Sequence, residues 1–253
     1  MAPFPRAPFR LIASFVASPA AKLFTDQFVW FTVVVAYLLG SIPFGLLLAK
    51  WLKGVDLRAI GSGNIGATNA SRALGRKWGL VVFALDFVKG WAPVYCAKFV
   101  GSVASDDENL ILLRIACGTA AVLGHCYSIY LGFKGGKGVA TGCGAIVAIS
   151  FWIFACGGAV WLLTRFITRY AGLASIMMGF TFPLAAWLLP FDFLHLPDTL
   201  EPHCSQLVIA SSLLTLLIFV RHRSNIQRML AGTEPRAGEK RPPSESEAAR
   251  HHG

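Results

Sequence analysis

Long apolar runs separated by short charged loops are the feature that most limits what this chain can fold into. Only 14% of its 253 residues are charged, whereas a soluble domain carries about a quarter. Most of these runs are close to the roughly 20 residues that a helix needs to cross a bilayer. We therefore predict an all-α integral membrane protein, with runs at 28–52, 79–100, 110–133, 139–164, 171–191 and 205–220.

The loops between the runs alternate in charge. Basic residues gather in 53–77, 134–138, 165–170 and the C-terminal tail, and acidic residues gather in 101–109 and 192–203. Short loops rich in Lys and Arg stay on the cytoplasmic side of a membrane. The basic loops are therefore expected to be cytoplasmic, and the acidic loops are expected to face outward.

The run at 139–164 fits either one long span or two short tilted helices. The loops on both sides of it are basic, so the chain is expected to cross the membrane and return, with a turn near Ser150. About seven transmembrane helices result, some of them short, with the N-terminus outside and the C-terminus inside. A six-span version would place Arg165 and Arg169 outside, which the charge pattern disfavours.

Three parts are expected along the chain. Residues 1–26 form a basic extension that fits either a signal-peptide-like segment or a helix on the membrane surface. Residues 27–231 form a single polytopic membrane domain, and 232–253 form a disordered cytoplasmic tail. The net charge of +10 sits in the loops and fits an anionic substrate and membrane lipids as partners, not nucleic acid.

Polar residues at the ends of apolar runs are costly in a membrane, so they are functional candidates. The first group is a glycine-rich run followed by Arg72. Alternating glycines leave backbone N–H groups free to face an anion, and an arginine suits a phosphate. A flexible loop without a ligand is the alternative. The candidates in this run are Gly61, Ser62, Gly63, Asn64, Thr68 and Asn69.

The second group is Asp86 and Lys89, which stand three residues apart within an apolar run. On a helix they share a face and form a pair. Two interpretations stay open. Lys89 binds substrate, or the two residues form a structural ion pair that braces the loops around the site.

The third group starts at Gly124 and His125 and continues in a turn rich in Gly and Lys. Such a turn before a short helix resembles a phosphate cradle, in which N–H groups and the helix dipole face the anion. It is not a Walker A loop, because GxxxxGK[ST] is absent. His125 alone fits a structural histidine equally well. The candidates are His125, Gly135, Gly136, Lys137, Gly138 and Thr141.

The fourth group lies where the last apolar run ends. His222 and Asn225 stand about one helical turn apart and can address one ligand. The neighbouring arginines are interpreted as ordinary positive-inside anchors.

Together these segments resemble the bacterial acyl-phosphate:glycerol-3-phosphate acyltransferase family of the PlsY type, from about Ala36 to Glu234. The resemblance implies seven transmembrane helices, a cytoplasmic site, and acyl transfer from acyl phosphate to the sn-1 hydroxyl of glycerol 3-phosphate, giving lysophosphatidic acid and phosphate. The chain departs from the family at Tyr127-Ser128, where an aromatic residue and proline are usual, and at Gly172, where serine is frequent. The matching segments are 40–45, 61–72, 86–90, 124–125, 133–141, 173–176 and 221–226. They imply substrate-site roles for Ser62, Asn69, Arg72, Lys137, Ser175, His222 and Asn225, with Ser62, Arg72, Lys137, His222 and Asn225 as the catalytic set.

Acyl phosphate is already activated, so neither a covalent intermediate nor a cofactor or metal is expected. The site must hold two phosphates and align the hydroxyl, with His222 or a phosphate oxygen as the base. Enzymes of this kind that use acyl-CoA carry a His-x4-Asp motif, which this sequence lacks. A soluble acyl-carrier-protein phosphotransacylase is the expected source of acyl phosphate. A transporter or channel for a phosphorylated solute is the alternative, but it would be expected to show two related halves.

Overall fold

The computed structural model describes residues 27–100, 107–189 and 205–236, and every regular element in these ranges is helical. The expected N-terminal extension, residues 101–106 and 190–204 of the outward loops, and the tail from 237 lie outside the described residues. The helices are α3 (Gln27–Ser41), α4 (Phe44–Lys53), η1 (Leu57–Ala59), α5 (Ala67–Leu74), α6 (Arg76–Cys96), η2 (Ala97–Phe99), α7 (Asp107–Cys126), η3 (Ile129–Leu131), α8 (Val139–Ile149), α9 (Phe151–Thr168), α10 (Ala171–Leu188), α12 (Ser205–Arg221) and α13 (Arg223–Leu230).

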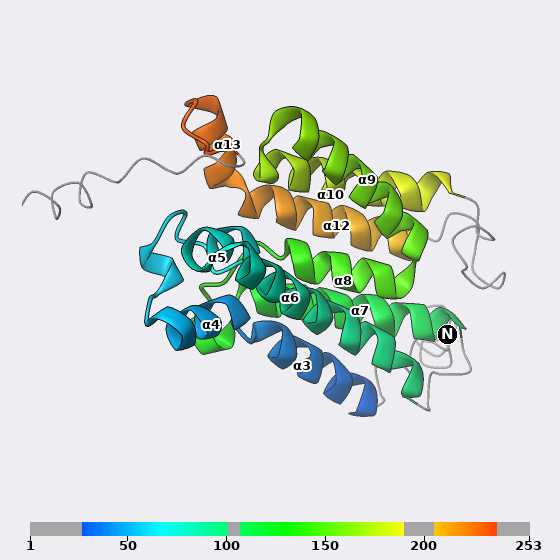
Figure 1. Ribbon diagram of the computed structural model, residues 1–253. Coiled ribbons are helices and arrows are strands. Elements are labelled where there is room, and N and C mark those ends of the chain that lie inside the picture. Colours follow the sequence, from blue (N-terminus) through cyan, green and yellow to red (C-terminus); the bar gives the residue numbers. More distant parts are fainter. Residues whose placement is uncertain (1–26, 101–106, 190–204, 237–253) are drawn as a thin grey trace, which may run out of the picture.

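The long helices lie side by side along one direction, as in a membrane-spanning bundle (Figure 1). Five stretches in the described part of the chain are long and apolar enough to cross a membrane. The pair α12 and α13, bent by 53°, is a sixth candidate if the two helices form one broken span, and α8 is a shorter apolar helix beside these six. The five long stretches are Gln27–Lys53, Arg76–Phe99, Asn109–Leu131, Phe151–Thr168 and Ala171–Leu188.

Helix α9 shows most clearly that the bundle is built for lipid. Large apolar side chains point away from the protein along it, and Phe166 is 85% exposed. In water such a surface would be a liability, whereas in a bilayer it meets acyl chains. The exposed side chains on this helix include Phe151, Leu162, Leu163, Phe166 and Ile167.

The apolar run that fitted either one span or two is broken at Ser150, as predicted. Helix α8 ends at Ile149 and α9 begins at Phe151, and α9 returns toward the end of the bundle that carries α13 (Figure 1). The 11 residues of α8 span only about 16 Å, half of a hydrocarbon core of about 30 Å. The loop before α8 can therefore lie below the surface of the bundle end.

Glycines let neighbouring helices pack closely. A Cβ atom on Gly90 of α6 would lie 2.0 Å from the carbonyl oxygen of Thr141 on α8, and one on Gly40 of α3 would lie 2.2 Å from that of Ala121 on α7. Small residues at such contacts are the usual solution in membranes, where helices associate through packing. Helix α6 thus packs tightly against α8, and α3 against α7.

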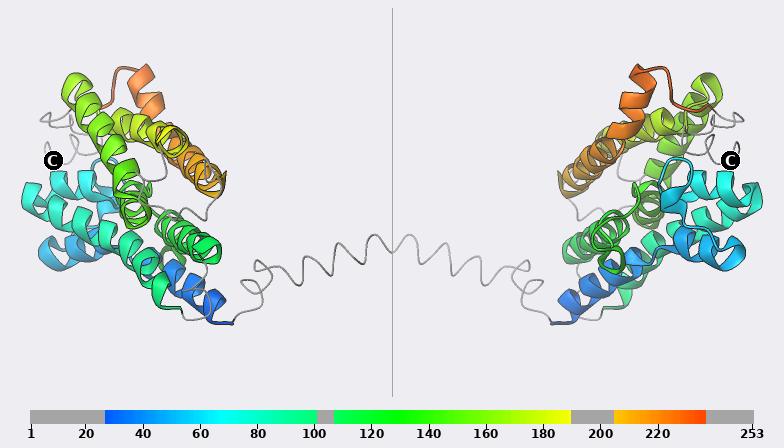
Figure 2. Two further views of the ribbon diagram at one scale, coloured as in Figure 1. Left: turned by 90° about the vertical axis from the view of Figure 1, so that its right-hand side faces the viewer. Right: turned by 90° about the vertical axis from the view of Figure 1, so that its left-hand side faces the viewer.

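Helices α3 to α6 occupy one side of the molecule and α10, α12 and α13 the other, in both views of Figure 2. A core cluster joins the two sides, because Phe87 of α6 packs against a buried group that contains Met178 and Phe182 of α10 and Leu207 of α12. Helices α4, α5 and α13 lie at the same end of the bundle (Figure 1). The polar groups predicted to carry function meet at that end.

Candidate active site

Lys137 and Asn225 form the centre of a polar cluster between the two sides of the bundle. The Lys137 ammonium, in the loop before α8, donates a hydrogen bond to Asn225 Oδ1 on α13. Asn225 is buried, with 6% exposure, and lies one turn after the bend at His222. The structure thus brings together two predicted groups that are 88 residues apart in the sequence.

The cluster has more positive than negative charge. Burial lowers the pKa of the Lys137 ammonium to about 8, with Arg228, Arg221 and Arg72 lowering it and Glu234 raising it. These four residues come from α13, α12, α5 and the segment after α13. Several cations forced together in a partly buried place are costly without an anion, so the arrangement suits a ligand with phosphate groups.

His222 sits at the bend between α12 and α13 and is buried. Its Nδ1 lies 2.8 Å from the carbonyl oxygen of Ile218. A carbonyl can only accept, so Nδ1 carries the proton, and Nε2 of the neutral ring keeps its lone pair. This is the tautomer that a general base needs.

Asn69 organises the first glycine-rich loop from beneath. Its amide nitrogen lies within 3.0 Å of the carbonyl oxygens of Leu57, Ile60 and Asn64, and its Oδ1 accepts from the N–H of Ser62. Both polar atoms of the Asn69 side chain therefore have partners in this loop and in η1. Asn69 holds the shape of the loop, whereas a direct contact with substrate was expected.

Gly61 and Gly63 give this loop its turns, with φ of +57° and +68°. At Gly61 a Cβ atom would lie 2.4 Å from Asn69 Oδ1. Several N–H groups of the loop bond within it, because Gly63 donates to Ile60 and Gly66 to Asn64 Oδ1. Fewer N–H groups of this loop are therefore free to face an anion than the sequence indicated.

The outer surface of the same loop carries exposed polar side chains. Within the described residues the Ser62 and Thr68 hydroxyls have no hydrogen-bond partner, and both residues are exposed. Arg72 is exposed one turn along α5, and its charge acts on Lys137. The electrostatic effect of Arg72 on Lys137 shows that α5 lies near the polar cluster.

The second glycine-rich loop corrects a prediction. The N–H groups of Gly135 and Gly136 were expected to face an anion, but they donate to the carbonyl oxygens of Cys126 and His125. The last carbonyls of an α-helix lack partners within it, and this loop supplies them for α7. A Cβ atom on Gly136 would lie 2.1 Å from His125 Nε2, so close packing explains why glycine stands here.

Arg221 holds the other side of this loop, a role that the sequence analysis missed when it interpreted the residue as an anchor. Its guanidinium donates to the carbonyl oxygens of Gly135 and Gly136 at 2.7 to 3.0 Å. It also lies over the ring of Tyr127, 5.3 Å from the centroid. The signal was available, because an arginine beside His222 can bond as well as anchor.

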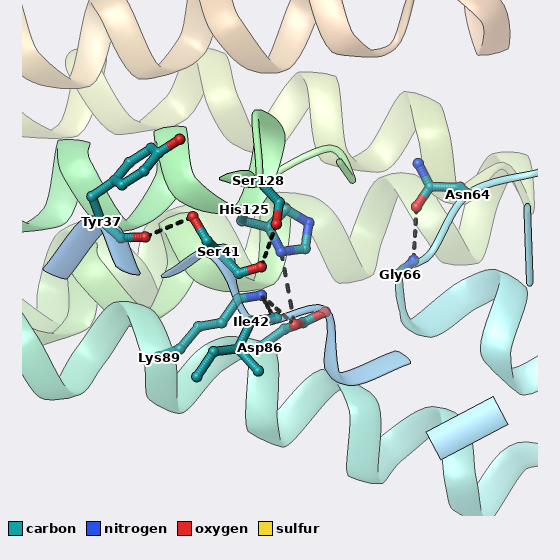
Figure 3. A network of polar contacts seen from close by, with 9 residues as sticks. All are labelled: Tyr37, Ser41, Ile42, Asn64, Gly66, Asp86, Lys89, His125 and Ser128. Atoms are coloured by element: carbon teal, nitrogen blue, oxygen red, sulfur yellow. Dashed lines mark hydrogen bonds and ion pairs between the residues drawn. The ribbon is translucent and has the colours of Figure 1, made fainter. Parts of the chain in front are cut away.

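Lys89 and His125, both expected to bind substrate, lie instead in a buried network deeper in the bundle (Figure 3). Lys89 Nζ is 2.8 Å from Asp86 Oδ1 and donates to the carbonyl oxygen of Ile42 at the break between α3 and α4. His125 Nδ1 lies 3.7 Å from the same Asp86 oxygen. These contacts are those expected of a structural ion pair, and we call Asp86, Lys89 and His125 the inner brace.

Three other candidates lie at the margin of the cluster. Ser175 on α10 is buried, donates to the carbonyl oxygen of Ala171 and accepts from Trp161 Nε1. Thr141 is fully buried in α8 against Gly90, and its hydroxyl has no partner in the described residues. Gly138, with φ of +79°, precedes α8 as its N-cap.

Glu234 belongs to the cluster although the sequence placed it in the disordered tail. Residues 232–236 are described, and the Glu234 carboxylate accepts from Asn225 Nδ2 and from Arg228 Nε, both at 2.6 Å. The expected tail therefore begins too early in the sequence analysis. A single acid in a polar stretch gives no periodic signal, so pattern reading could not find it.

A hollow of about 570 Å³ lies near the same end, between α4, η1 and η3. It shares no residue with the polar cluster, so it carries no part of the argument for the site. Its lining consists of Ile42, Pro43, Leu46, Leu47, Lys50, Arg58, Tyr130 and Leu131.

Comparisons with known proteins identify the family and the fold. A family model described as glycerol-3-phosphate acyltransferase matches residues 30–232. The glycerol-3-phosphate acyltransferase of Aquifex aeolicus (strain VF5) is 45% identical over 206 residues, which cover 81% of this chain and 97% of that protein. PlsY (YgiH), an integral membrane glycerol 3-phosphate acyltransferase, has been solved in two forms. Its glycerol 3-phosphate form matches with a TM-score of 0.70 and 42% identity, over 83% of this chain and 96% of that one. Its lysophosphatidic acid form matches with a TM-score of 0.68 and 41% identity, over 83% and 95%. The predicted all-α integral membrane fold and the family resemblance are thereby confirmed, and the chain belongs to the glycerol-3-phosphate acyltransferase family.

Proposed function

We propose that this protein transfers a fatty acyl group from acyl phosphate to the sn-1 hydroxyl of glycerol 3-phosphate, giving lysophosphatidic acid and inorganic phosphate. The observation that carries the proposal is the surplus of cations around Lys137, since Arg72, Arg221 and Arg228 act on its ammonium together with a single acid, Glu234. Two phosphate-bearing substrates held side by side need such a surplus.

The reaction is a direct transfer between the two substrates. The hydroxyl oxygen of glycerol 3-phosphate bonds to the acyl carbonyl carbon, and the carbon–oxygen bond to phosphate breaks with its electron pair leaving on phosphate. The hydroxyl proton goes to His222 Nε2 or to a phosphate oxygen. The bond from His222 Nδ1 to the Ile218 carbonyl supports His222, because it leaves Nε2 free to accept the proton.

The predicted residues take distinct roles in this proposal. Lys137 and Arg72 hold the phosphates and offset the charge that develops on the carbonyl oxygen. The hydroxyl groups of Ser62, in the first loop, and Thr68, in the first turn of α5, donate hydrogen bonds to the substrate. The shape of the loop is set by Gly61, Gly63, Asn64 and Asn69. Asn225 keeps the Lys137 ammonium in place through its amide oxygen.

We place the protein in the bacterial inner membrane, with the cluster on the cytoplasmic face, the N-terminus outside and the C-terminus inside. The basic loops at this end of the bundle support that orientation, and a soluble acyl-carrier-protein phosphotransacylase would deliver acyl phosphate from the same side. In a cysteine-free background, labelling from outside should modify Ser105→Cys and spare Arg76→Cys and Thr168→Cys. Outside labelling at position 168 would contradict the seven-span topology.

The decisive experiment is a donor comparison with purified protein in lipid vesicles. Labelled glycerol 3-phosphate is supplied with palmitoyl phosphate, palmitoyl-CoA or palmitoyl acyl carrier protein, and labelled lysophosphatidic acid is measured. We expect product with acyl phosphate alone, together with one phosphate per acyl chain transferred. Comparable turnover with acyl-CoA would show that the donor is misassigned.

A further inference from the structure

The acid Glu234 closes the polar cluster at a place that the family model does not reach, since the match ends at residue 232. The chain turns back after α13, and the backbone N–H of Glu234 donates to the carbonyl oxygen of Arg228 at 3.1 Å. This turn buries the carboxylate to 8% exposure. One carboxylate oxygen accepts from Asn225 Nδ2 and the other from Arg228 Nε.

These contacts fix which way the Asn225 amide points. A carboxylate only accepts and an ammonium only donates, so the amide nitrogen must face Glu234 and the amide oxygen must face Lys137. Asn225 therefore links the two charges with one permitted orientation. Without the carboxylate, the amide could turn and present its nitrogen to the ammonium, which would repel it.

Glu234 also supplies the negative charge within the cluster. Among the described charged groups that act on Lys137, Arg228 of α13, Arg221 of α12 and Arg72 of α5 oppose the ammonium charge, and Glu234 favours it. His222, at the bend between α12 and α13, is the remaining titratable neighbour. The charge state of Lys137 thus depends first on its burial and then on the balance between Glu234 and three arginines.

We propose that Glu234 is a positioning residue of the acyl-transfer site, which orients the Asn225 amide toward Lys137 and keeps the Lys137 ammonium charged for phosphate binding. The inference rests on the proposed function, in which Lys137 binds phosphate. It assigns a role in the reaction to the segment after α13, which the sequence pattern assigned to the tail.

The test compares Glu234→Gln, Arg228→Gln and the double variant in full-length protein in lipid vesicles, with palmitoyl phosphate and glycerol 3-phosphate. The readout is kcat/KM against pH, which reports groups of the free enzyme. Glutamine keeps an acceptor for Asn225 but removes the negative charge, so the alkaline midpoint should fall by about one pH unit. Removing the Arg228 cation should move the midpoint upward, and the double variant should lie between the two.

Opposite shifts are the signature that a merely structural role would not give. If both single variants lose activity with the midpoint unchanged, or shifted in the same direction, Glu234 only holds the end of α13 and the inference is overturned. Thermal unfolding of each variant checks that the protein is folded. Lys137→Ala separates the two proposals, because full activity in that variant would refute phosphate binding by Lys137, whatever Glu234 does.

Discussion

Two lysines, the buried Lys89 and the half-buried Lys137, lie in contrasting environments within the same bundle. Lys89, in the inner brace, is paired with Asp86 and bonds a backbone carbonyl, so its charge is matched. Lys137, in the polar cluster around Asn225 that we call the outer cluster, bonds a neutral amide, and the charges of three arginines and one glutamate act on it. The balanced Asp86–Lys89 pair suits a structural role, whereas the surplus of cations around Lys137 suits the binding of an anion. The difference separates structural from functional lysines more sharply than burial does.

The largest effect is expected when the balance of the inner brace is broken. Lys89→Ala leaves Asp86 buried without its partner, and removing one member of a buried pair costs about 3–5 kcal/mol of stability. Thermal unfolding in detergent should show a large loss. Replacing both residues, as Asp86→Leu with Lys89→Met, should recover much of it, because no lone charge remains. A Lys89→Ala protein as stable as the wild type would mean that the pair does not brace the bundle.

In the outer cluster the same kind of substitution should harm activity and spare the fold. Lys137→Ala and Arg72→Ala each remove a cation from the transition state, at a cost of about 2–4 kcal/mol in kcat/KM. Lys134→Ala is the matched control, because Lys134 is an exposed lysine of the same loop and should lose little. Near-normal activity in both variants, with the protein folded, would rule out the phosphate site.

His222 decides which group takes the proton. If it is the base, His222→Ala should lower kcat by roughly a hundredfold, as loss of a general base does, with little change in KM for glycerol 3-phosphate. Steady-state kinetics at varied glycerol 3-phosphate give both constants. Recovery of the rate at high glycerol 3-phosphate would instead assign His222 to binding and leave a phosphate oxygen as the base.

The dependence of kcat/KM on pH should be set by the outer cluster and not by the inner brace. Lys137 is protonated below its pKa of about 8 and loses its charge above it. We therefore expect kcat/KM to show no loss from this group below that value and to fall about tenfold per pH unit well above it. The double variant of the inner brace should keep the same midpoint. A midpoint that moves with the inner brace would break the distinction between the two lysines.

Much of this arrangement was open to prediction, because apolar runs and loop charge have a direct physical meaning. The turn at Ser150 followed from the basic loops on both sides of one run. The hydrogen-bond partners of the Gly135 and Gly136 N–H groups could not be predicted in this way. A glycine-rich turn that caps a helix has the same sequence pattern as one that binds phosphate. The bonds of Arg221 to that loop, 85 residues away, could not be predicted either, since side-chain pairing across such distances leaves no local pattern.

The smallest effect concerns the wall of the outer cluster at Gly172, where the family often has serine. A Cβ atom there would lie 2.9 to 3.1 Å from the Asn225 side chain. The Asn225 side chain must shift by a few tenths of an ångström to accept this Cβ atom, and its hydrogen bonds to Lys137 and Glu234 oppose that shift. Gly172→Ala should lower kcat/KM roughly threefold, because small displacements of a positioned group reduce the rate. Gly158→Ala on α9 is the matched control, since its Cβ would meet nothing within 4 Å, and its activity should be unchanged. Equal activity in both variants would show that Asn225 tolerates movement, and would weaken the view that its fixed orientation is what distinguishes the outer cluster.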